Sequence, residues 1–464
     1  MDFEHTLKSL LPEWSVDPLP EINGIIKKGK LSLVVLDDDP TGTQTVYDIP
    51  VLTEWSTESI HKEFQSKTPL FYILTNSRAL QERDAIELAR EIGRNLTKAS
   101  SETGRGFRVI SRSDSTLRGH YPAEVDALEQ QLDKKTNKHI IIPFFFEGGR
   151  LTIEDIHYVR EGNNLIPAAE TSFAQDATFG YKSSNLKEWV EEKSKGKISR
   201  DSVGSITIQD IRAGGPSKIA DILTHSINPV IVVNSVTQRD AEVIALGMLM
   251  AEQRGASFIM RSAASIVSAL GGLKTKPILS KEDLNISNSG GSLTIVGSYQ
   301  PKSSRQLEHL LQNADCHSVL LDVKNVLSEE STVNYIQQTT DEINKALSAE
   351  KNVVIYTSRE LVTSASPEKS LDIVTRVSSC LVDIVGRLKS RPRFIISKGG
   401  ITSSDVATKS LKTKRATVLG QILPGVPVWR LDSSSKFPNM VYIVFPGNVG
   451  EVESMTGVVQ KLMP

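Results

Sequence analysis

Short apolar runs alternate with amphipathic helical segments along most of this chain, and this alternation limits the possible folds more than any other feature of the sequence. Residues 31–36 and 69–74 are apolar runs of strand length that end at polar residues. Between residues 85 and 96, apolar side chains recur at spacings of three and four, which predicts a helix with one buried face. Strands that alternate with such helices predict an α/β fold with a mostly parallel sheet flanked by helices.

The alternation runs in two series, which predicts two α/β domains. Further strands are predicted at 107–111, 139–143, 206–211, 229–234, 257–260, 293–297, 318–322, 352–356, 393–396 and 426–430. Further helices are predicted at 121–132, 238–254, 301–312, 331–348, 369–389 and 403–411. Residues 147–200 hold few strand-like runs. The Gly-, Ser- and Asn-rich segment 271–292 is the best candidate linker, so we predict domains at 1–275 and 290–464.

The charge balance and the cysteine count exclude several classes of protein. The 464 residues include 54 lysines and arginines against 55 aspartates and glutamates, so the net charge of −1 gives no bulk attraction to nucleic acid or anionic lipid. No apolar run approaches the roughly 18 residues that a membrane span needs, and the N-terminus lacks the features of a secretory signal. With two cysteines and no zinc-ligand spacing among eight histidines, we expect a cytoplasmic protein with neither nucleic-acid nor membrane partners.

Three adjacent aspartates, Asp37, Asp38 and Asp39, follow the first predicted strand and are succeeded by a Pro-Thr-Gly turn. Adjacent carboxylates repel one another, so this loop is unfavourable unless a cation or hydroxyl donors compensate. Because ligands of parallel sheets bind beyond the carboxyl ends of the strands, the loop could bind sugar hydroxyls or hold a base near a phosphate acceptor. The alternative is a solvated turn in which Asp39 or Thr41 caps a helix.

A second polar loop, Ser111 to His120, follows the strand at 107–111 and concentrates hydroxyl, carboxylate and guanidinium groups. Arginine can hold a carboxylate through two parallel hydrogen bonds, and serine and threonine add hydroxyl donors, so the loop suits a small polyol that carries a carboxylate. The alternative is a hydrophilic loop in which Ser115 or Thr116 caps a helix. Asn76 and Arg78, which follow the predicted strand at 69–74, could line the same crevice. The candidate substrate-binding residues are Asn76, Arg78, Ser113, Asp114, Ser115, Thr116 and Arg118.

Three glycine-bearing segments, residues 297–301, 398–405 and 445–450, follow predicted strands in the second half of the chain. Glycines at strand-to-helix turns let backbone N–H groups approach phosphate oxygens, and a helix N-terminus favours negative charge. Each segment alone is a weak signal because glycine ends many strands, but three at corresponding strand ends favour a nucleotide site. The P-loop, dinucleotide and protein-kinase fingerprints are absent. The candidate nucleotide-binding residues are Ser298, Gly399, Gly400, Ile401, Thr402 and Gly447.

Taken together, these motifs resemble the four-carbon acid sugar kinase family, and the resemblance covers nearly the whole chain. It is carried by Asp37-Asp38 with Thr41-Gly42, by residues 113–119, 171–176, 179–181 and 261–265, and by residues 297–298, 399–403 and 447–450. The resemblance implies an N-terminal acid-sugar-binding domain, a C-terminal ATP-binding domain and an active site in the interdomain cleft. It also implies transfer of the γ-phosphate to the terminal hydroxyl of threonate, erythronate or 3-oxo-tetronate.

The resemblance implies roles for the candidate residues. Asp38 or Asp37 would orient or deprotonate the acceptor hydroxyl, and Arg118 would hold the acid sugar's carboxylate with neighbouring serines. The glycine loops would hold ATP, with Mg²⁺ bridging its phosphates and no metal ligand assigned. Two stretches depart from the family pattern. The first loop either has Pro40 where the family has phenylalanine or, aligned on Asp37, carries an extra residue, and Ile401 stands where the family has glutamate.

Two other functions stay open at this point. One is an acid-sugar sensor that binds nucleotide as an effector, since the change to Ile401 in the glycine loop could be the mark of a protein that has lost kinase activity. The other is an oxidoreductase or aldolase that acts on similar acids, although the dinucleotide fingerprint of the former and the histidine cluster of the latter are missing. The expected partner is a small-molecule acid sugar, and a homodimer is conceivable. The sequence leaves open which acid sugar is bound and which of the three aspartates is the base.

Overall fold

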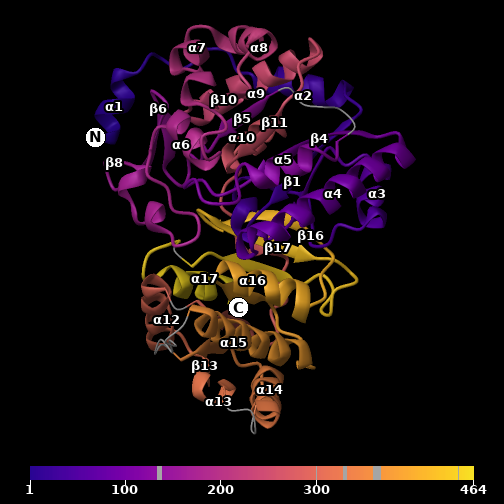
Figure 1. The fold of residues 1–464 in the computed structure, drawn as a ribbon. Helices are drawn as coiled ribbons and strands as arrows, with labels where there is room; N and C mark the ends of the chain where they lie inside the picture. The colour runs from indigo at the N-terminus through magenta and orange to yellow at the C-terminus, as the bar shows by residue number, and fades with distance from the viewer. Residues whose placement is uncertain (133–137, 299, 328–331, 359–366, 448, 464) are drawn as a thin grey trace. The chain divides into compact units, whose positions relative to one another are not determined.

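The computed structural model describes residues 1–132, 138–298, 300–327, 332–358, 367–447 and 449–463. Tyr299 and Asn448, which belong to two of the predicted nucleotide loops, lie outside the described residues. The chain forms two compact units, and helices cover the strands of each (Figure 1). The first unit consists of Met1–Val46 and Glu54–Thr275, and the second consists of Tyr47–Thr53 and Lys276–Pro464.

The first unit is built on a parallel sheet with the strand order β3-β1-β4-β11-β5-β10-β9. Its strands are β1 (Leu31–Asp37), β3 (Leu70–Leu74), β4 (Gly106–Arg112), β5 (His139–Ile142), β9 (Val203–Ile206), β10 (Val230–Val233) and β11 (Ile259–Ser262). The chain passes from β1 to β3 on one side and then to β4 on the other side of β1. The carboxyl end of β1 is therefore a switch point, which is where open α/β sheets bind their ligands.

Helices cover this sheet because each presents an apolar stripe to it. The helix predicted from the spacing between residues 85 and 96 is α4 (Glu82–Thr103), which buries Ala85, Ile92 and Leu96. The other helices of this unit are α1 (Phe3–Ser9), α2 (Leu19–Lys28), α3 (Thr57–Gln65), α5 (Ala123–Glu129), α6 (Leu186–Lys193), α7 (Ile208–Arg212), α8 (Gly215–His225), α9 (Gln238–Gln253) and α10 (Ala264–Leu270).

Two predictions for the first unit are wrong. Residues 147–200, expected to hold few strands, contain an antiparallel sheet of β6 (Arg150–Ile153), β7 (Ile156–Glu161) and β8 (Asn164–Pro167). These strands are short and are joined by tight turns, so they give little periodic signal. Residues 206–211 are not a strand, because β9 ends at Ile206 and α7 begins two residues later. Thr207 and Asp210 form a capping box there, which fixes the start of the helix.

The second unit has a mixed sheet with the strand order β13-β14-β12-β15-β18-β17-β16-β2. Its strands are β2 (Ile49–Leu52), β12 (Leu293–Val296), β13 (His317–Leu321), β14 (Val353–Thr357), β15 (Ile395–Lys398), β16 (Arg415–Leu423), β17 (Val426–Leu431) and β18 (Val441–Phe445). The pairs from β13 to β18 are parallel, and the remaining pairs are antiparallel. The segment 47–53 lies early in the sequence, yet its strand β2 pairs with β16 of this unit.

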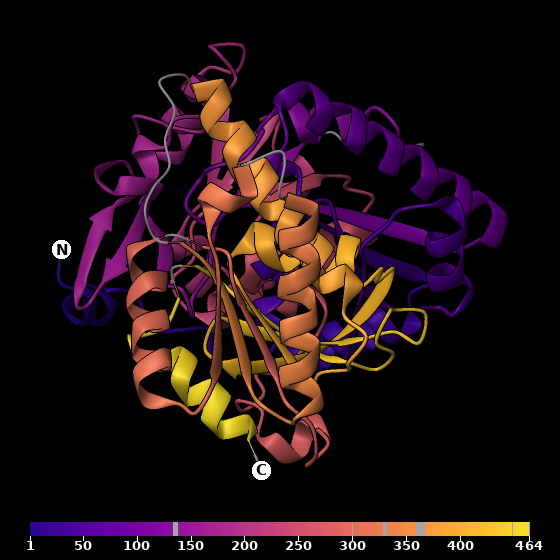
Figure 2. The ribbon, with the colours of Figure 1, turned by 90° about the horizontal axis from the view of Figure 1, so that it is seen from below.

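Helices lie on both faces of this second sheet, as Figure 2 shows. They are α11 (Lys281–Leu284), α12 (Pro301–Asn313), α13 (Val323–Leu327), α14 (Thr332–Ser348), α15 (Pro367–Arg387), α16 (Gly400–Asp405) and α17 (Ser454–Leu462). α12 packs against α17, and α14 packs against α15. The fold-class prediction of two α/β units with mostly parallel sheets flanked by helices is confirmed. Among the described helices, none combines the length and the apolar character that a membrane span needs.

Candidate functional site

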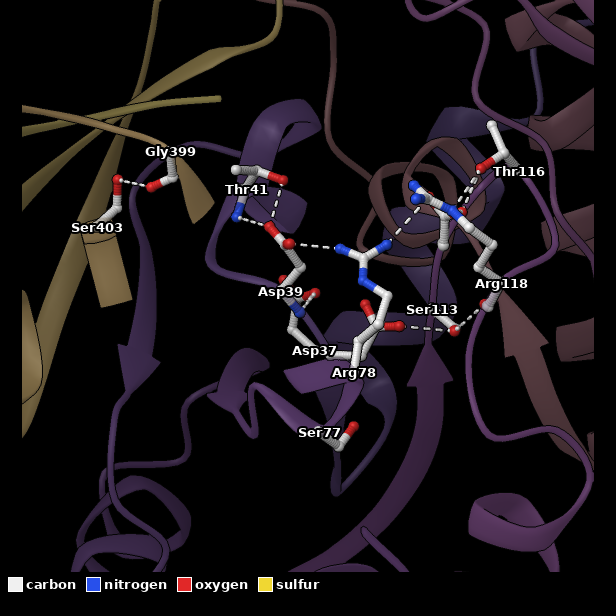
Figure 3. Close-up of polar contacts among 12 residues, drawn as sticks. Asp37, Asp39, Thr41, Ser77, Arg78, Ser113, Thr116, Arg118, Gly399 and Ser403 are labelled. Carbon is white, nitrogen blue, oxygen red and sulfur yellow. Dashed lines mark hydrogen bonds and ion pairs between the residues drawn. The ribbon is translucent and has the colours of Figure 1, made fainter. Parts of the chain in front are cut away.

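Parallel pairing of β3, β1 and β4 collects the predicted polar loops at one edge of the first sheet. β1 ends at Asp37, β3 is followed by Asn76 and Arg78, and β4 ends at Arg112. Register pairs Asp37 with Leu74 on one side and with Arg112 on the other, so the three loops start at the same level. Figure 3 shows the acidic loop, Arg78 and the loop after β4 converging there. We call the charged residues of these loops the acidic-loop cluster: Asp37, Asp38, Asp39, Arg78, Arg112, Asp114 and Arg118.

Arg112 joins the first two aspartates. Its Nη1 lies 3.0 Å from Asp37 Oδ1 and 3.7 Å from Asp38 Oδ1, and all three side chains are buried. Ser113 Oγ donates a 2.8 Å hydrogen bond to Asp38 Oδ2. Asp37 Oδ2 and Asp38 Oδ1 are buried carboxylate oxygens without a hydrogen-bond partner in the described structure. A buried carboxylate oxygen without a donor is unfavourable, so these two atoms mark the carboxyl end of β1 as a candidate site.

Burial raises the pKa of Asp37 to about 7, against the attraction of Arg112 and with the support of the neighbouring Asp38 charge. Asp37 is 1 % exposed, and the backbone of the turn packs directly against it. A Cβ at Gly42 would overlap with both carboxylate oxygens of Asp37. Gly42 is therefore required so that the loop can close over this side chain.

The third aspartate has a different environment. Asp39 Oδ1 accepts hydrogen bonds from Thr41 N at 2.9 Å and Thr41 Oγ1 at 2.5 Å, and its Oδ2 accepts from Arg78. Burial opposes ionisation of Asp39, but the Arg78 charge and the Thr41 bonds outweigh burial and lower its pKa. One part of the alternative is confirmed, because Asp39 caps the short 3₁₀ helix Pro40–Thr45, but the turn is not solvated, since Pro40, Gly42, Thr43 and Gln44 are buried. Both carboxylate oxygens of Asp39 accept hydrogen bonds, whereas Asp37 and Asp38 each keep one oxygen without a hydrogen-bond partner in the described structure.

Asp114 connects the two arginines of the loops. Its Oδ1 lies 3.1 Å from Arg78 Nη1, and its Oδ2 accepts from Arg118 Nε at 2.8 Å. Against the effect of burial, these two charges hold the pKa of Asp114 well below its usual range, so it is a fixed anion. Arg118 Nη1 also lies 3.5 Å from Asp176 Oδ2, and the guanidinium stands over the Phe173 ring at 5.2 Å. Both candidate carboxylate-binding arginines therefore already have protein carboxylates as neighbours.

The remaining predicted substrate residues lie around this cluster. Asn76 adopts a left-handed backbone with φ of 52° and its side chain is half-buried. Ser115 is buried, and its carbonyl accepts a 2.7 Å hydrogen bond from His157 Nε2. Burial lowers the pKa of His157 to about 4, so this ring is neutral at physiological pH. Thr116 Oγ1 donates to Asp114 and so orients the carboxylate rather than capping a helix.

Arg112 and Arg261 are structural parts of the site that sequence reasoning did not select. Arg261 is the last but one residue of β11 and is buried; its Nη2 donates to the Asp114 carbonyl at 3.0 Å and the Arg118 carbonyl at 2.9 Å. It therefore holds the backbone of the loop that carries the substrate-binding candidates. The signal that could have found both arginines is that each stands at the carboxyl end of a predicted strand or next to it.

Glu124 of α5 contacts Ser77, which lies in the loop after β3 beside Arg78. Its Oε1 accepts a 2.7 Å hydrogen bond from Ser77 Oγ. Burial raises the pKa of Glu124 to about 7 despite that hydrogen bond. The carboxyl group is thus mainly neutral below pH 7 and mainly charged above it. The buried charge lowers the stability of the fold at high pH.

We expect Glu124→Gln to stabilise the protein at pH 8 and to leave it nearly unchanged at pH 4. Folding raises the pKa of Glu124. Its contribution to the free energy of unfolding is therefore fully present below its pKa in the unfolded chain and is lost as pH rises through its folded-state pKa of about 7. Glutamine keeps an acceptor for Ser77 and never ionises. The gain should be on the order of 1–3 kcal/mol at pH 8, measured by urea unfolding. A gain of equal size at both pH values would show that ionisation is not its cause.

The second unit brings the three glycine loops together. β12, β15 and β18 are adjacent and parallel, so the segments that follow them start side by side. Ser303 Oγ donates to Ser298 Oγ at 3.0 Å and is 2.9 Å from the Gly447 carbonyl oxygen, which links the first loop to the third. A Cβ at Gly447 would lie 3.1 Å from Ser298 Oγ, and one at Gly297 would overlap with Thr402 Oγ1. A side chain at Gly297 would therefore displace Thr402, and one at Gly447 would be tight against Ser298, because the loops approach so closely.

Gly399 and Gly400 lie where β15 passes into α16. Gly399 has a φ of 112°, a conformation that residues with a side chain rarely adopt. Its carbonyl accepts a 2.7 Å hydrogen bond from Ser403 Oγ, which closes the first turn of the helix. Ile401 is 51 % exposed, so the side chain that replaces the family's glutamate points to solvent. The helix begins at Gly400, three residues before the predicted start, and continues as a π-helical turn over Val406–Ser410.

Comparison with known proteins identifies both units. The family model of a sugar-binding N-terminal domain matches residues 33–270, and that of a nucleotide-binding C-terminal domain matches residues 293–455. The two matched ranges fall on the two units of the fold, so the chain combines a domain of the sugar-binding family with a domain of the nucleotide-binding family. The chain belongs to the four-carbon acid sugar kinase family, as its motifs predicted.

One relative supports this assignment, and two solved structures share the fold. D-threonate kinase of Salmonella typhimurium strain LT2 is 24% identical over 343 residues, which are 70% of this chain and 74% of that protein. A structure from S. typhimurium LT2 with a provisional tRNA synthase description has a TM-score of 0.71 at 18% identity and covers 94% of this chain and 100% of its own. A Haemophilus influenzae protein assigned to DUF1537 has a TM-score of 0.63 at 18% identity, with coverages of 93% and 100%. At such identities the two structures show the fold alone.

Proposed function

We propose that this protein is an ATP-dependent kinase that phosphorylates the terminal hydroxyl of a four-carbon acid sugar of the threonate, erythronate or 3-oxo-tetronate class. The observation that carries the proposal is the acidic-loop cluster, in which unpartnered carboxylate oxygens lie next to arginines at a switch point. An acceptor hydroxyl needs a carboxylate to orient or deprotonate it, and the sugar's own carboxylate needs a guanidinium. The relative named D-threonate kinase supports the same substrate class.

Asp38 is the better candidate for the base. Its Oδ1 is free of hydrogen bonds in the described structure, while its Oδ2 is oriented by Ser113. Asp37 has the more buried side chain and packs against the Gly42 turn, so it is better placed to set the charge beside Asp38 than to touch the substrate. Phosphoryl transfer depends mainly on such positioning and on charge neutralisation, because the protein forms no covalent intermediate in a direct transfer.

Arg118 is the residue we assign to the sugar's carboxylate. Its ion pair with Asp176 is long, at 3.5 Å, whereas its contact with Asp114 is 2.8 Å. A substrate carboxylate could therefore replace Asp176 at Nη1 while Asp114 keeps the guanidinium in place. Ser115 and Asn76, which border the cluster, would complete the polyol site, and Ser298, Gly399, Gly400, Thr402 and Gly447 would hold the nucleotide.

Magnesium fits this chemistry as a complex with ATP. Among the described residues, no group of three or more metal-ligating side chains is present. The unpartnered oxygens of Asp37 and Asp38 form only a pair, so phosphate and water oxygens would supply most ligands of the ion. When bound, Mg²⁺ neutralises the charge that develops on the transferred phosphoryl group.

The test is an ADP-release assay with a panel of four-carbon aldonates and 3-oxo-tetronates, in the presence of ATP and Mg²⁺. We expect ADP release that depends on one acid sugar and not on water alone, with a phosphorylated product detectable by mass spectrometry. Binding of acid sugar and nucleotide without any turnover would favour a sensor. Turnover that requires a redox cofactor would refute the proposal.

We expect Arg118→Ala to weaken acid-sugar binding by about tenfold to a hundredfold, because a charge-assisted hydrogen bond contributes roughly 1.5–3 kcal/mol. Calorimetric titration with the substrate found in the panel measures the loss. Arg200→Ala is the matched control, since Arg200 is an exposed arginine of the same unit that pairs with Glu188. Nucleotide binding should be unchanged in both variants. An Arg118→Ala protein that binds the acid sugar normally would exclude Arg118 as the carboxylate ligand.

A further inference from the structure

One lysine among the glycine loops has no role in the site as described so far. Lys398 is the last residue of β15, immediately before Gly399. Register places it between Val296 of β12 and Phe445 of β18, the strand-end residues from which the other two loops start. Lys398 is therefore at the centre of the three strands that carry the glycine loops.

The side chain of Lys398 is buried with little compensation. Its exposed fraction is 0 %, and its Nζ donates a 2.7 Å hydrogen bond to the Pro446 carbonyl. The ammonium also lies 4.1 Å from the centre of the Phe445 ring, whose face attracts a cation. An ammonium has three donors, and the described structure gives this one a single hydrogen-bond acceptor. A buried cation in such surroundings is unfavourable unless a negative charge is nearby.

The charged groups on the neighbouring helices do not supply that negative charge. Lys302 at the start of α12 acts on Lys398 with the same sign. Asp405 of α16 is engaged elsewhere, because it pairs with Lys409 at 2.7 Å and accepts from Ser378 at 2.8 Å. Tyr442 of β18 donates to the Ser403 carbonyl, and burial raises its pKa, so it is neutral. Burial, with a contribution from Lys302, lowers the pKa of Lys398 to about 7.

We propose that Lys398 is a positioning residue of the nucleotide site: its ammonium fixes the Pro446–Gly447 turn and provides a buried positive charge whose counter-charge is the nucleotide's phosphates. The inference rests on the proposed function, since it deepens the assignment of the glycine loops. Lys398 acts through the turn that it holds and through space, and the low polarity around it makes that action strong. A neutral residue of similar shape could fill the space, so the charge itself is the reason for a lysine here.

This arrangement couples nucleotide binding to protonation. In the free protein, Lys398 titrates near pH 7; a bound polyphosphate favours the ammonium and raises that value. Nucleotide binding should therefore take up protons at pH 7.5–8. Affinity should be highest below pH 7, where the lysine is already charged, and should fall as pH rises above 7 toward the pKa of the complex. A purely structural hydrogen bond to Pro446 would cause no proton uptake.

The experiment is calorimetric titration of the full-length protein with ADP at pH 6, 7 and 8, in pairs of buffers that differ in ionisation enthalpy. ADP is the probe because it binds without turnover. We expect the wild type to take up a substantial fraction of a proton at pH 8. Lys398→Met should abolish that uptake, weaken ADP binding at pH 6 by about tenfold or more, and flatten the pH dependence. Lys345→Met, which removes an exposed lysine of α14 in the same unit, is the control and should behave as the wild type in proton uptake.

The outcomes separate this inference from the proposed function. A wild type that binds ADP with neither proton uptake nor pH dependence would overturn the role of Lys398 whatever the variants do, so the test does not depend on the folding of Lys398→Met. Proton uptake that persists in a folded Lys398→Met protein would overturn it as well. Failure of the wild type to bind ADP at any pH would refute the proposed function and, with it, this inference.

Discussion

Asp38→Asn is expected to lower turnover by roughly 10²–10⁴ while the protein stays folded, since this is the usual contribution of a positioned general base. Asparagine is nearly isosteric and keeps an oxygen for the hydrogen bond from Ser113, which in the wild type is 2.8 Å long. It cannot accept a proton from the acceptor hydroxyl. Nucleotide affinity should not change, because the glycine loops belong to the other unit. Steady-state ADP release and calorimetry with ADP measure the two quantities.

The same substitution at the neighbouring aspartates provides the controls. Asp39→Asn should free Arg78 and weaken acid-sugar binding more than turnover, because Asp39 is held by Thr41 and Arg78. Asp37→Asn should raise stability above pH 7, since the penalty for ionising Asp37 appears as pH rises through its pKa of about 7. Equal and small losses of turnover at all three positions would remove the acidic loop from the chemistry. Asp114 would be a poor replacement as base, because Arg78 and Arg118 lower its pKa and so weaken its affinity for a proton.

Gly399→Val is expected to weaken nucleotide binding on the order of a hundredfold or more. At a φ of 112°, any residue with a Cβ is strained, and strain of this kind costs about 1–3 kcal/mol. The new Cβ would lie 3.1 Å from Ser298 Cβ and 3.4 Å from Thr402 Oγ1, so the branched methyl groups would force the glycine loops apart. Calorimetry with ADP measures the loss, and acid-sugar binding should be retained.

Gly457→Val is the matched control for Gly399→Val. Gly457 lies in α17 of the same unit, and nothing stands within 4 Å of a Cβ built there. Its replacement should leave ADP affinity within about twofold of the wild type, since valine in a helix costs only a few tenths of a kcal/mol relative to other residues. If both variants lost affinity equally, the effect would reflect general destabilisation of the unit and not the geometry of the loop.

The sequence predicted the elements that depend on local patterns. Apolar runs such as 31–36 and 69–74 are buried strands, and the polar residues that end them gather at one sheet edge because parallel strands share a direction. The positions of the acidic loop and the loop after β4 follow from the same rule. The family assignment was also accessible, since its motifs are contiguous in the chain.

What the sequence could not supply are the partners that strand order selects. Arg112 meets Asp37 only because β4 pairs with β1, and Arg261 reaches the loop after β4 only because β11 is the next strand in the sheet. No spacing along the chain encodes these neighbours. The difference between Asp37 and Asp39 has the same origin, because depth of burial and the identity of the facing arginine set the two pKa values in opposite directions.

The pairing of β2 with β16 affects when the second unit can fold during synthesis and how its gene can be cut into fragments. The strand formed by Ile49–Leu52 leaves the ribosome more than 350 residues before its partner Arg415–Leu423. The sheet of the second unit therefore cannot be completed from the C-terminal half alone. A fragment that starts after residue 275 would expose the β16 edge, and open edges of this kind invite aggregation. Gene fragments meant to isolate the nucleotide-binding unit should carry residues 47–53, for example as a strand fused ahead of residue 276.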